Sequence, residues 1–388
     1  MRDLDIAIVG GGIGGLATAL GLARAGFRPT VYEQVPALGE VGAGLSITPN
    51  SAKGLYFLGV GEALEREADE PRQQLLRHWK TNEVLLRIDR SGCRAHYGGP
   101  YLMIHRADLH RILADAFRAL VPKGIRLNVP VAALRQGAGG VELATKDGTT
   151  IRAGLVIAAD GLRSAVRAHL FGDDKPRFTG QVAYRGLIPR AALAGLAIAE
   201  GSCVWAGPGR VFLRYPLRHG ALMNCVVLER TEDWVEESWS VRADVNELKA
   251  KLADWPDEPR ALAAAIAPDQ FFKWGLFDRA PLPALHVGRV ALIGDAAHPM
   301  LPFHAQGAAS AIEDAVVLAR CLAAAGTPEA ALARYEAARR TRVTMLQVEA
   351  AKGGQSLQAP DPERFKTRTP ENEDALGIFH YDPATVPI

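Results

Sequence analysis

Glycines and acids recur in this chain at spacings that could bind a nucleotide. Gly10, Gly12 and Gly15 follow the pattern G-x-G-x-x-G, and Glu33 comes after them. In this pattern Gly10 permits a tight turn, Gly12 lets the backbone approach a pyrophosphate, and Gly15 lets a helix pack closely on a strand. The amide groups of the helix N-terminus would bind the phosphates, while Glu33 could accept hydrogen bonds from a ribose. The spacing therefore predicts a dinucleotide-binding site.

The segments around these glycines have the patterns of a strand, a helix and a second strand. Ile6–Val9 is an apolar run short enough for a buried strand. An Ala- and Leu-rich helical pattern follows and stops at Gly26, and a second short strand at residues 29–32 leads to Glu33. A glycine-rich turn without a ligand is the alternative, but such a turn does not require the complete strand–helix–strand unit.

Two further acids follow strand-like apolar runs. Asp160 comes after the run 155–159, and Asp295 comes after the run 290–293 and a glycine. The carboxyl ends of parallel strands meet at the edge where α/β sheets bind ligands, so both acids are expected beside Glu33. Asp295 is placed to accept hydrogen bonds from sugar-like hydroxyls. For Asp160 the alternative is a plain turn before a solvated helix.

Two helix starts complete the predicted site. Gln306, Gly307 and Ala308 open an amphipathic helix whose first amide groups need partners. The pyrimidine ring of a flavin is a good candidate, because reduced flavin carries negative charge near N1 and O2 that a helix N-terminus stabilises. Arg106 stands just before another predicted helix, with Asp108 as its expected N-cap, and could contact a phosphate or a ribose. A surface ion pair is the alternative for Arg106.

Composition excludes several classes of protein. The 388 residues carry a formal net charge of +2, which is too balanced to predict nucleic acid or an acidic membrane as the main partner. The four cysteines lie far apart without a CxxC pair, which argues against a structural zinc site and fits reduced thiols. The N-terminus enters a strand directly, without the pattern of a signal peptide. We therefore expect a cytoplasmic protein, either a monomer or a homodimer, with no metal.

Three motifs in order make a family resemblance specific. The stretches GGGIGG, VIAADGLRSAVR and VALIGDAAHPMLPFHAQGAASAIEDA resemble those of the single-component FAD-dependent aromatic hydroxylases, within a resemblance that covers about residues 5–345. Among these enzymes the chain is most similar to the salicylate hydroxylase and 6-hydroxynicotinate 3-monooxygenase branch. The resemblance implies a cycle in which NADH or NADPH reduces the flavin, O2 adds at its C4a carbon, and a hydroxyl passes to an electron-rich ring. A phenolic or hydroxypyridine-type substrate, with a carboxylate, is expected.

The order of strand-like and helical patterns along the chain predicts an α/β fold. We expect a Rossmann-like FAD-binding domain, an inserted mixed and largely antiparallel β-sheet substrate domain, and a C-terminal helix. The alternating polar and apolar runs place the boundaries as follows: FAD-binding domain 1–72, 101–177 and 276–325; substrate domain 73–100 and 178–275; C-terminal helix and tail 326–388. The tail from Gly353 onward is polar and proline-rich, so we expect it to lie on the surface.

The resemblance also implies which individual residues contact the cofactors. It implies that Asp160 serves both FAD and NAD(P)H, and that residues 299–306 run beside the isoalloxazine ring. The positions that it implies as FAD contacts are Gly14, Glu33, Gln34, Ser46, Arg106, Asp295 and Ala308.

The expected substrate-binding sheet differs from the family pattern at one position. In the hydroxynicotinate-type enzymes a His lies four residues before a Tyr, and in this chain those positions are Val211 and Tyr215. His304 could supply the missing proton acceptor or bind the substrate, with a structural role as the alternative. Arg185 could pair with a substrate carboxylate. Arg214 also could, but it adjoins Tyr215 on an alternating strand and should point to the opposite face.

Other functions remain to be weighed against hydroxylation. A flavin halogenase would need the signature WxWxIP, and Trp205, Trp234 and Trp239 lack that spacing. A flavin-binding sensor, or a degenerate enzyme that only oxidises NADH, is favoured by Val211 alone. A simple NAD-dependent dehydrogenase would explain the first glycine motif but not the two later motifs. The aromatic substrate, the carbon hydroxylated, any loss of a carboxylate and the choice between NADH and NADPH stay open.

Overall fold

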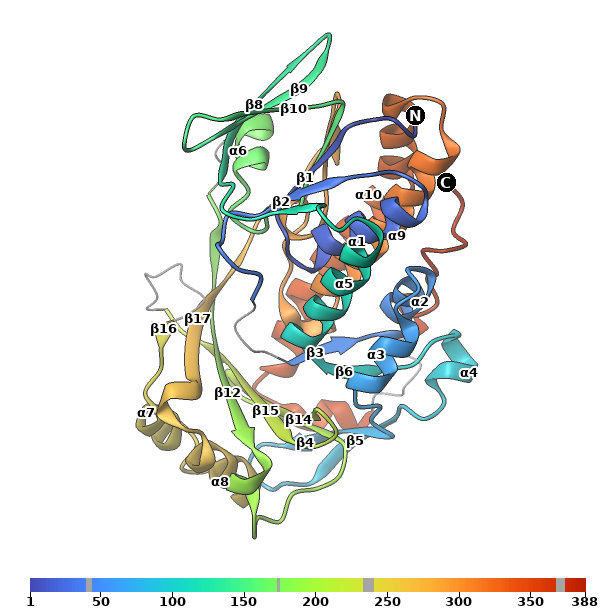
Figure 1. The fold of residues 1–388 in the computed structure, drawn as a ribbon. Coiled ribbons are helices and arrows are strands. Elements are labelled where there is room, and N and C mark those ends of the chain that lie inside the picture. The colour runs from blue at the N-terminus through green and yellow to red at the C-terminus, as the bar shows by residue number, and fades with distance from the viewer. Residues whose placement is uncertain (40–43, 173–174, 233–240, 368–373) are drawn as a thin grey trace.

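The computed structural model describes residues 1–39, 44–172, 175–232, 241–367 and 374–388. Trp234 and Trp239 of the halogenase comparison lie outside the described residues. The chain forms two sheet-based layers that are joined by long helices (Figure 1). Among the described helices, none combines the length and the apolar character that crossing a membrane requires.

A six-stranded sheet holds the predicted nucleotide site. Its strands lie in the order β18-β19-β11-β1-β2-β7. Their bounds are β1 Ile6–Val9, β2 Thr30–Tyr32, β7 Ile125–Arg126, β11 Leu155–Ala158, β18 His286–Val287 and β19 Val290–Leu292. All neighbouring pairs are parallel except β18 with β19. The chain leaves β2, β11 and β19 just before Glu33, Asp160 and Asp295, so the three acids lie at the same edge of the sheet.

Helices with small side chains pack beside this sheet. Helix α1 (Ile13–Arg24) contacts α5 (Arg106–Leu120) and α9 (Gly307–Ala324), as Figure 1 shows. A Cβ added at Gly21 would come within 3.1 Å of Ala319 Cβ and of Leu58 Cδ2, so α1 approaches its neighbours closely only because it is rich in Gly and Ala. The other helices of this domain are α2 Pro49–Phe57, α3 Gly61–Glu67 and α6 Ala165–Phe171.

Smaller sheets flank the same core. The antiparallel strands β8 Val131–Gly137, β9 Gly140–Thr145 and β10 Thr150–Ala153 form one of them, and β3 Gly44–Ile47 pairs with β6 Leu102–His105 in the other. Leu134, Val141 and Leu143 of the first are buried in the core of the six-stranded sheet.

An eight-stranded sheet forms the second layer, in the order β16-β17-β12-β15-β14-β13-β4-β5. Its bounds are β4 Gln73–His78, β5 Val84–Asp89, β12 Arg177–Pro189, β13 Ser202–Gly207, β14 Arg210–Leu217, β15 Leu222–Arg230, β16 Val241–Arg242 and β17 Phe271–Asp278. Only β4 with β13 is parallel within the described strands. The α/β fold class with a mixed, largely antiparallel second sheet is thereby confirmed.

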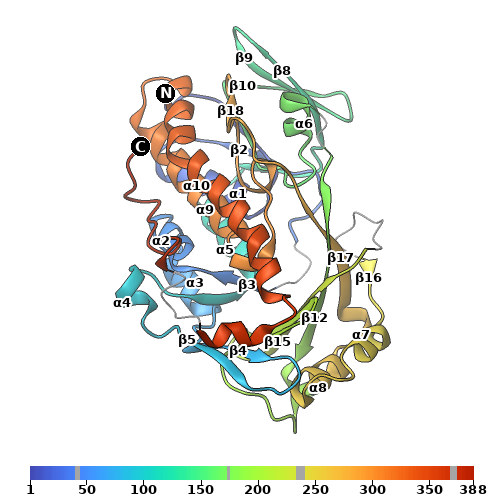
Figure 2. The same ribbon diagram turned by 180° about the vertical axis from the view of Figure 1, so that it is seen from behind.

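The two faces of this sheet have different neighbours. Helices α7 (Val245–Lys251) and α8 (Asp257–Ala265) cover the outer face, where Leu248 and Leu262 pack on Phe212. The inner face meets the nucleotide-binding layer and α10 (Pro328–Leu357), a helix of 30 residues that spans from one layer to the other (Figure 2). The inner face of the eight-stranded sheet is therefore the face turned toward the nucleotide-binding layer.

Two local expectations are corrected by the structure, and one helix was not expected. Helix α5 is capped by His105, whose Nδ1 accepts from the Ala107 amide at 3.2 Å, whereas Asp108 lies in the first turn and forms an ion pair with Arg218. Helix α8 was not predicted from the sequence. The chain beyond Gly353 is not simply a surface tail, because α10 continues to Leu357 and Phe379 is buried.

Candidate active site

The glycine loop between β1 and α1 is shaped by contacts that only glycine allows. Gly10 has a φ of +104°, and a Cβ there would lie 2.4 Å from the Ala159 carbonyl oxygen. At Gly15 a Cβ would lie 2.0 Å from the Gly10 carbonyl oxygen. A Cβ at Gly12 would meet nothing within 4 Å. Gly10 and Gly15 are therefore required by the fold itself, whereas Gly12 leaves open space in front of the helix.

Glu33 holds this loop through its backbone. Its Oε2 accepts from the Gly11 amide at 2.6 Å, and its Oε1 accepts from the Val35 amide at 3.0 Å. On the other side the Gly11 carbonyl accepts from His110 Nε2 at 2.7 Å. Each carboxylate oxygen of Glu33 can accept a further hydrogen bond, as binding a ribose would require. His110 was not predicted, because in the sequence it is one more position on the buried face of an amphipathic helix.

The two later acids lie in distinct surroundings. Asp160 Oδ2 accepts from the Val166 amide at 3.3 Å, and its Oδ1 is buried with no partner among the described residues. Burial raises the pKa of the Asp160 carboxyl, against the hydrogen bond from Ser164. The pKa of Asp295 is likewise raised by surrounding protein, while the charges of His298 and Arg106 oppose the rise. The Asp295 side chain is nevertheless exposed to solvent, and Arg106 is close enough for its charge to act on the Asp295 carboxyl.

A loop of residues 294–307 follows β19 and leads into α9; it is called the flavin loop because residues 299–306 are expected beside the flavin ring. Gln306 anchors its far end from inside the protein: its Oε1 accepts from Asn50 Nδ2 at 2.9 Å, and its Nε2 donates to Thr48 Oγ1 at 3.3 Å. At the near end the Gly294 amide donates to Asp314 Oδ2 at 3.0 Å. Both ends of the loop are thus tied to residues of neighbouring elements: Thr48 and Asn50 at the start of α2, and Asp314 of α9.

A buried charge network stands behind this loop. Glu313 and Asp314 of α9 pair with Arg339 of α10 at 2.6 and 2.8 Å, and Arg342 adds a second contact to Glu313 at 2.8 Å. Burial disfavours the charge on Asp314, but the His298 and Arg339 charges and the hydrogen bonds from His298 and Gly294 outweigh it and hold the pKa of Asp314 at about 2. The network therefore carries ionised carboxylates that fix the loop against α9 and α10.

These features fit an FAD molecule. Within the part of the chain that the structure describes, no side chain caps the N-terminus of α1 or of α9. A Cβ at Gly307, as at Gly12, would meet nothing within 4 Å. The amides of α1 can bind a pyrophosphate, those of α9 can face a flavin ring, and the unpartnered Asp160 Oδ1 and the accessible Asp295 supply acceptors between them.

The other residues predicted to contact FAD have the following surroundings. Gln34 is exposed directly after Glu33, and Ala308 is half-buried in the first turn of α9. Ser46 lies on β3, where its hydroxyl contacts Met103 Sδ at 3.3 Å. At Gly14 a Cβ would lie 3.2 Å from the Ala311 side chain, so this position is tightly packed against α9.

The inner face of the eight-stranded sheet, called the floor below, is turned toward the nucleotide-binding layer. Arg185 is buried, with its guanidinium 5.2 Å from the centre of the Trp274 ring. Tyr215 is also buried, and Gly44 packs so closely on it that a Cβ there would lie 2.4 Å from Tyr215 Cε2. Burial raises the pKa of Tyr215, and the nearby charge of Arg185 opposes the rise. Arg185 and Tyr215 therefore share one apolar floor, where Tyr215 stays neutral.

The alternation along β14 separates the two arginines of the substrate sheet. Arg214 points to the outer face, where it pairs with Glu258 of α8 at 2.7 Å and lies 6.0 Å from the Trp205 ring. Val211 points inward, into an aliphatic cluster with Leu301 and Ala350. The position of the missing His is thus filled by an apolar contact between the sheet, the flavin loop and α10.

Two histidines lie near this floor. His304 belongs to a short 3-10 turn, Pro302–His304, and its Nε2 donates to the Glu349 carbonyl of α10 at 3.1 Å. His105 was not predicted as a site residue; burial lowers its pKa, and the charges of Arg218 and Arg185 lower it further. Because Nδ1 of His105 accepts the Ala107 amide, a neutral His105 carries its proton on Nε2. It is therefore a neutral donor beside Gly44, its partner across β3 and β6.

Comparisons with known proteins agree with this geometry. The model of the family described as "FAD binding domain" matches residues 3–350. A 3-amino-4-hydroxybenzoate 2-monooxygenase from Streptomyces platensis is 40% identical over 98% of this chain and 97% of its own length. A 6-hydroxynicotinate 3-monooxygenase from Pseudomonas fluorescens is 34% identical over 99% and 96%. The crystal structure of Klebsiella pneumoniae HpxO complexed with FAD and uric acid superposes with a TM-score of 0.86 at 27% identity, covering 100% of this chain and 98% of that chain.

The chain belongs to this FAD-binding family. It is an FAD-dependent monooxygenase of the aromatic hydroxylase type, with FAD as cofactor and NAD(P)H as co-substrate. The resemblance inferred from the three motifs is confirmed, and a salicylate hydroxylase is also among the similar proteins.

Proposed function

We propose that this hydroxylase acts on an aromatic ring that carries both a hydroxyl and a carboxylate, and that Arg185 binds the carboxylate. The observation that supports this most directly is a buried guanidinium on the floor that faces the flavin domain, stacked on Trp274. Arg offers a planar pair of donors that matches a carboxylate. The names of the two curated relatives, a hydroxybenzoate and a hydroxynicotinate monooxygenase, describe rings of this kind.

Tyr215 is proposed to orient the ring. The Tyr215 phenol is protonated at neutral pH, and its raised pKa extends this state to higher pH, so it can donate a hydrogen bond to the hydroxyl oxygen on the substrate ring. When bound and reduced, FAD supplies the oxygen-activating chemistry at the opposite wall. The chain's own part is to hold the ring in a dry space between the floor and the flavin loop, where water cannot compete.

The proton acceptor differs from that of the hydroxynicotinate-type enzymes. Val211 cannot accept a proton, and His304 could do so through Nε2 only after releasing the Glu349 carbonyl. We therefore propose that His304 holds the flavin loop on α10, and that its contribution to hydroxylation depends on this contact. A flavoprotein that oxidises NADH without hydroxylating remains the second candidate, and the apolar Val211 is the observation that favours it.

The test asks whether Arg185 binds the substrate carboxylate. FAD-loaded protein is assayed with NADH and with NADPH against hydroxybenzoates, amino-hydroxybenzoates and hydroxynicotinates, and against the methyl ester of each. Hydroxylated product and H2O2 are quantified together. The expected result is faster NAD(P)H oxidation with matching product for a carboxylate, and a KM that rises about 100-fold in Arg185→Met, as losing a charged hydrogen-bonded pair predicts.

The esters provide the control. For an ester, wild type and Arg185→Met should have similar KM values, because the interaction is already absent. Equal losses for acids and esters would show that Arg185 acts through the fold and not through the carboxylate. Faster NADH oxidation that yields only H2O2 with every compound would favour the oxidase candidate.

A further inference from the structure

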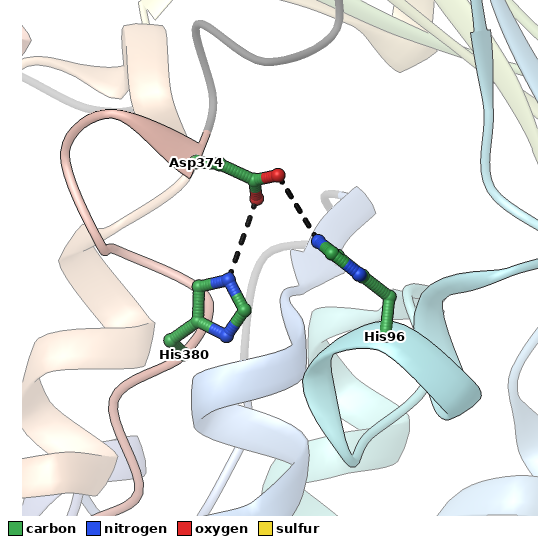
Figure 3. A group of neighbouring side chains, drawn as sticks. All are labelled: His96, Asp374 and His380. Carbon is green, nitrogen blue, oxygen red and sulfur yellow. Dashed lines mark hydrogen bonds and ion pairs between the residues drawn. The ribbon is translucent and has the colours of Figure 1, made fainter.

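A second group of chemically active side chains lies away from the flavin site. His96 belongs to α4 (Cys93–Tyr97), whereas Asp374 and His380 belong to the C-terminal segment after α10. Figure 3 shows that the two imidazole rings approach the same carboxylate from both sides. All three side chains are partly accessible, with exposed fractions of 56%, 34% and 48%. A small ion from solvent can therefore reach them.

The distances within this group are close to those between the ligands of one metal ion, with the two imidazoles contacting different oxygens of the same carboxylate. His96 Nε2 lies 3.0 Å from Asp374 Oδ2, and His380 Nε2 lies 3.6 Å from Asp374 Oδ1. One ligand atom from each residue lies within 4.8 Å of the other two. Bonds of about 2.0–2.1 Å at a tetrahedral angle place two ligand atoms about 3.3 Å apart. Small rotations of these side chains would therefore bring all three ligands onto one ion.

Neighbouring groups, chiefly Tyr97 and Lys53, hold the three side chains in place. The Tyr97 hydroxyl donates to Asp374 Oδ1 at 2.6 Å, and this hydrogen bond is the main cause of the lowered pKa of Asp374. The Tyr97 ring also packs edge-on against His96 and His380, with ring centres 4.5 and 4.9 Å away. Lys53 donates to the carbonyls of Tyr97 and His380 at 2.8 and 3.1 Å. Such surrounding hydrogen bonds are what orient the ligands in metal sites.

We propose that His96, Asp374 and His380 form a binding site for a divalent transition-metal ion, with Zn²⁺ as the best fit. Two imidazoles and one carboxylate suit zinc, copper and nickel, whereas magnesium and calcium prefer all-oxygen sites. The three protein ligands would leave the fourth tetrahedral position to water.

The site would connect the C-terminal segment to the substrate floor. Ile378 and Phe379 stand between the two C-terminal ligands and are buried in one cluster with Tyr215. The Arg342 guanidinium holds the Ile378 carbonyl at 2.9 Å. A metal ion that joins α4 to this segment would therefore stabilise the wall behind Tyr215 without contacting the substrate.

The test is a zinc titration of the FAD-loaded full chain, purified without a histidine tag and freed of metal with a chelator. Isothermal titration calorimetry should show one equivalent of Zn²⁺, and zinc X-ray absorption should show first-shell N and O ligands at about 2.0–2.1 Å. His96→Ala and His380→Ala should each weaken binding at least about tenfold, and Tyr97→Phe should weaken it about tenfold. His169→Ala, at an exposed position on α6, is the matched control and should bind zinc like the wild type.

Two outcomes would overturn the proposal. One is the absence of a saturable zinc equivalent in the wild type. The other is a zinc affinity that His96→Ala, His380→Ala and Asp374→Asn all leave unchanged, which would make the cluster a set of ordinary hydrogen bonds and ion pairs. Because the readouts are binding and metal–ligand distances, neither outcome depends on whether the proposed substrate is correct.

Discussion

His298 donates a hydrogen bond through Nε2 to Asp314 Oδ2 at 2.6 Å, and neither side chain is accessible to solvent. The same carboxylate oxygen accepts the Gly294 amide, and its other oxygen accepts Arg339 Nε at 2.8 Å. Asp314 therefore joins the start of the flavin loop to α9 and α10 through a single buried side chain.

Asp314→Asn should be severely destabilising. The amide has the size of the carboxylate but removes its charge, which leaves the buried Arg339 with one acidic partner fewer. Breaking a buried pair in this way costs about 3–5 kcal/mol, which chemical denaturation of the FAD-loaded protein can measure. Glu329→Gln is the control, since Glu329 forms an exposed pair with Arg289 at 2.6 Å and should change stability by less than about 1 kcal/mol. Equal effects of the two substitutions would contradict the central role of Asp314.

Two glycines of the nucleotide loop should respond differently to alanine. Gly15→Ala places a Cβ against the Gly10 carbonyl and should lower the Tm of the apoprotein itself. Gly12 has a φ of −73° and space around it, so Gly12→Ala should leave that Tm unchanged. It should still weaken FAD binding about tenfold or more, because the methyl group occupies the approach to the pyrophosphate. Full FAD affinity in Gly12→Ala would place the phosphates elsewhere.

Asp295→Ala should lose FAD. The carboxylate is solvent-accessible beside Arg106 at the strand edge, where it can accept hydrogen bonds from ribityl or ribose hydroxyls. The measurement is the flavin-to-protein absorbance ratio after gel filtration, followed by titration with FAD. Asp269→Asn changes an exposed acid outside the nucleotide-binding sheet, so this variant should keep its yellow colour. A fully loaded Asp295→Ala protein would exclude the assignment.

His105 should make stability depend on pH between neutral and mildly acidic conditions. Its pKa is lowered by burial from the ordinary value of 6.5, so the unfolded chain binds a proton that the folded chain does not. Its contribution is present above pH 6.5 and is lost as the pH falls through 6.5 toward the folded pKa. His105→Asn keeps an acceptor for the Ala107 amide without a titrating ring, so its free energy of unfolding should decline less from pH 7 to pH 5. Parallel declines in both proteins would show that His105 is not responsible.

His304 variants can separate positioning from proton transfer. Gln can still donate to the Glu349 carbonyl, whereas Ala cannot. If His304 holds the loop, His304→Gln should keep hydroxylation within a few-fold of wild type, and His304→Ala should divert NADH oxidation toward H2O2. If His304 is instead the catalytic base, both variants lose it and show the same shift in the pH profile of kcat. That result would assign proton transfer to His304.

The sequence by itself determined the features that depend on local spacing. Glu33, Asp160 and Asp295 lie at one edge of the sheet because each follows a parallel strand, and parallel strands end at a common edge. Arg214 turns away from Tyr215 because side chains alternate along a strand, and the structure confirms this through the pair with Glu258. The family motifs likewise consist of contiguous residues, so they can be recognised without a structure.

Only the tertiary structure decided which distant residues touch. The contacts of His304 with α10, of Asp314 with Arg339, and of His96 with Asp374 join segments separated by 25 to 278 residues. No periodicity encodes such contacts, because they depend on how long helices pack and on where the chain returns after them. The N-cap of α5 illustrates this point. His105 caps the helix instead of Asp108, because the Asp108 carboxylate is engaged in an ion pair with Arg218, 110 residues away.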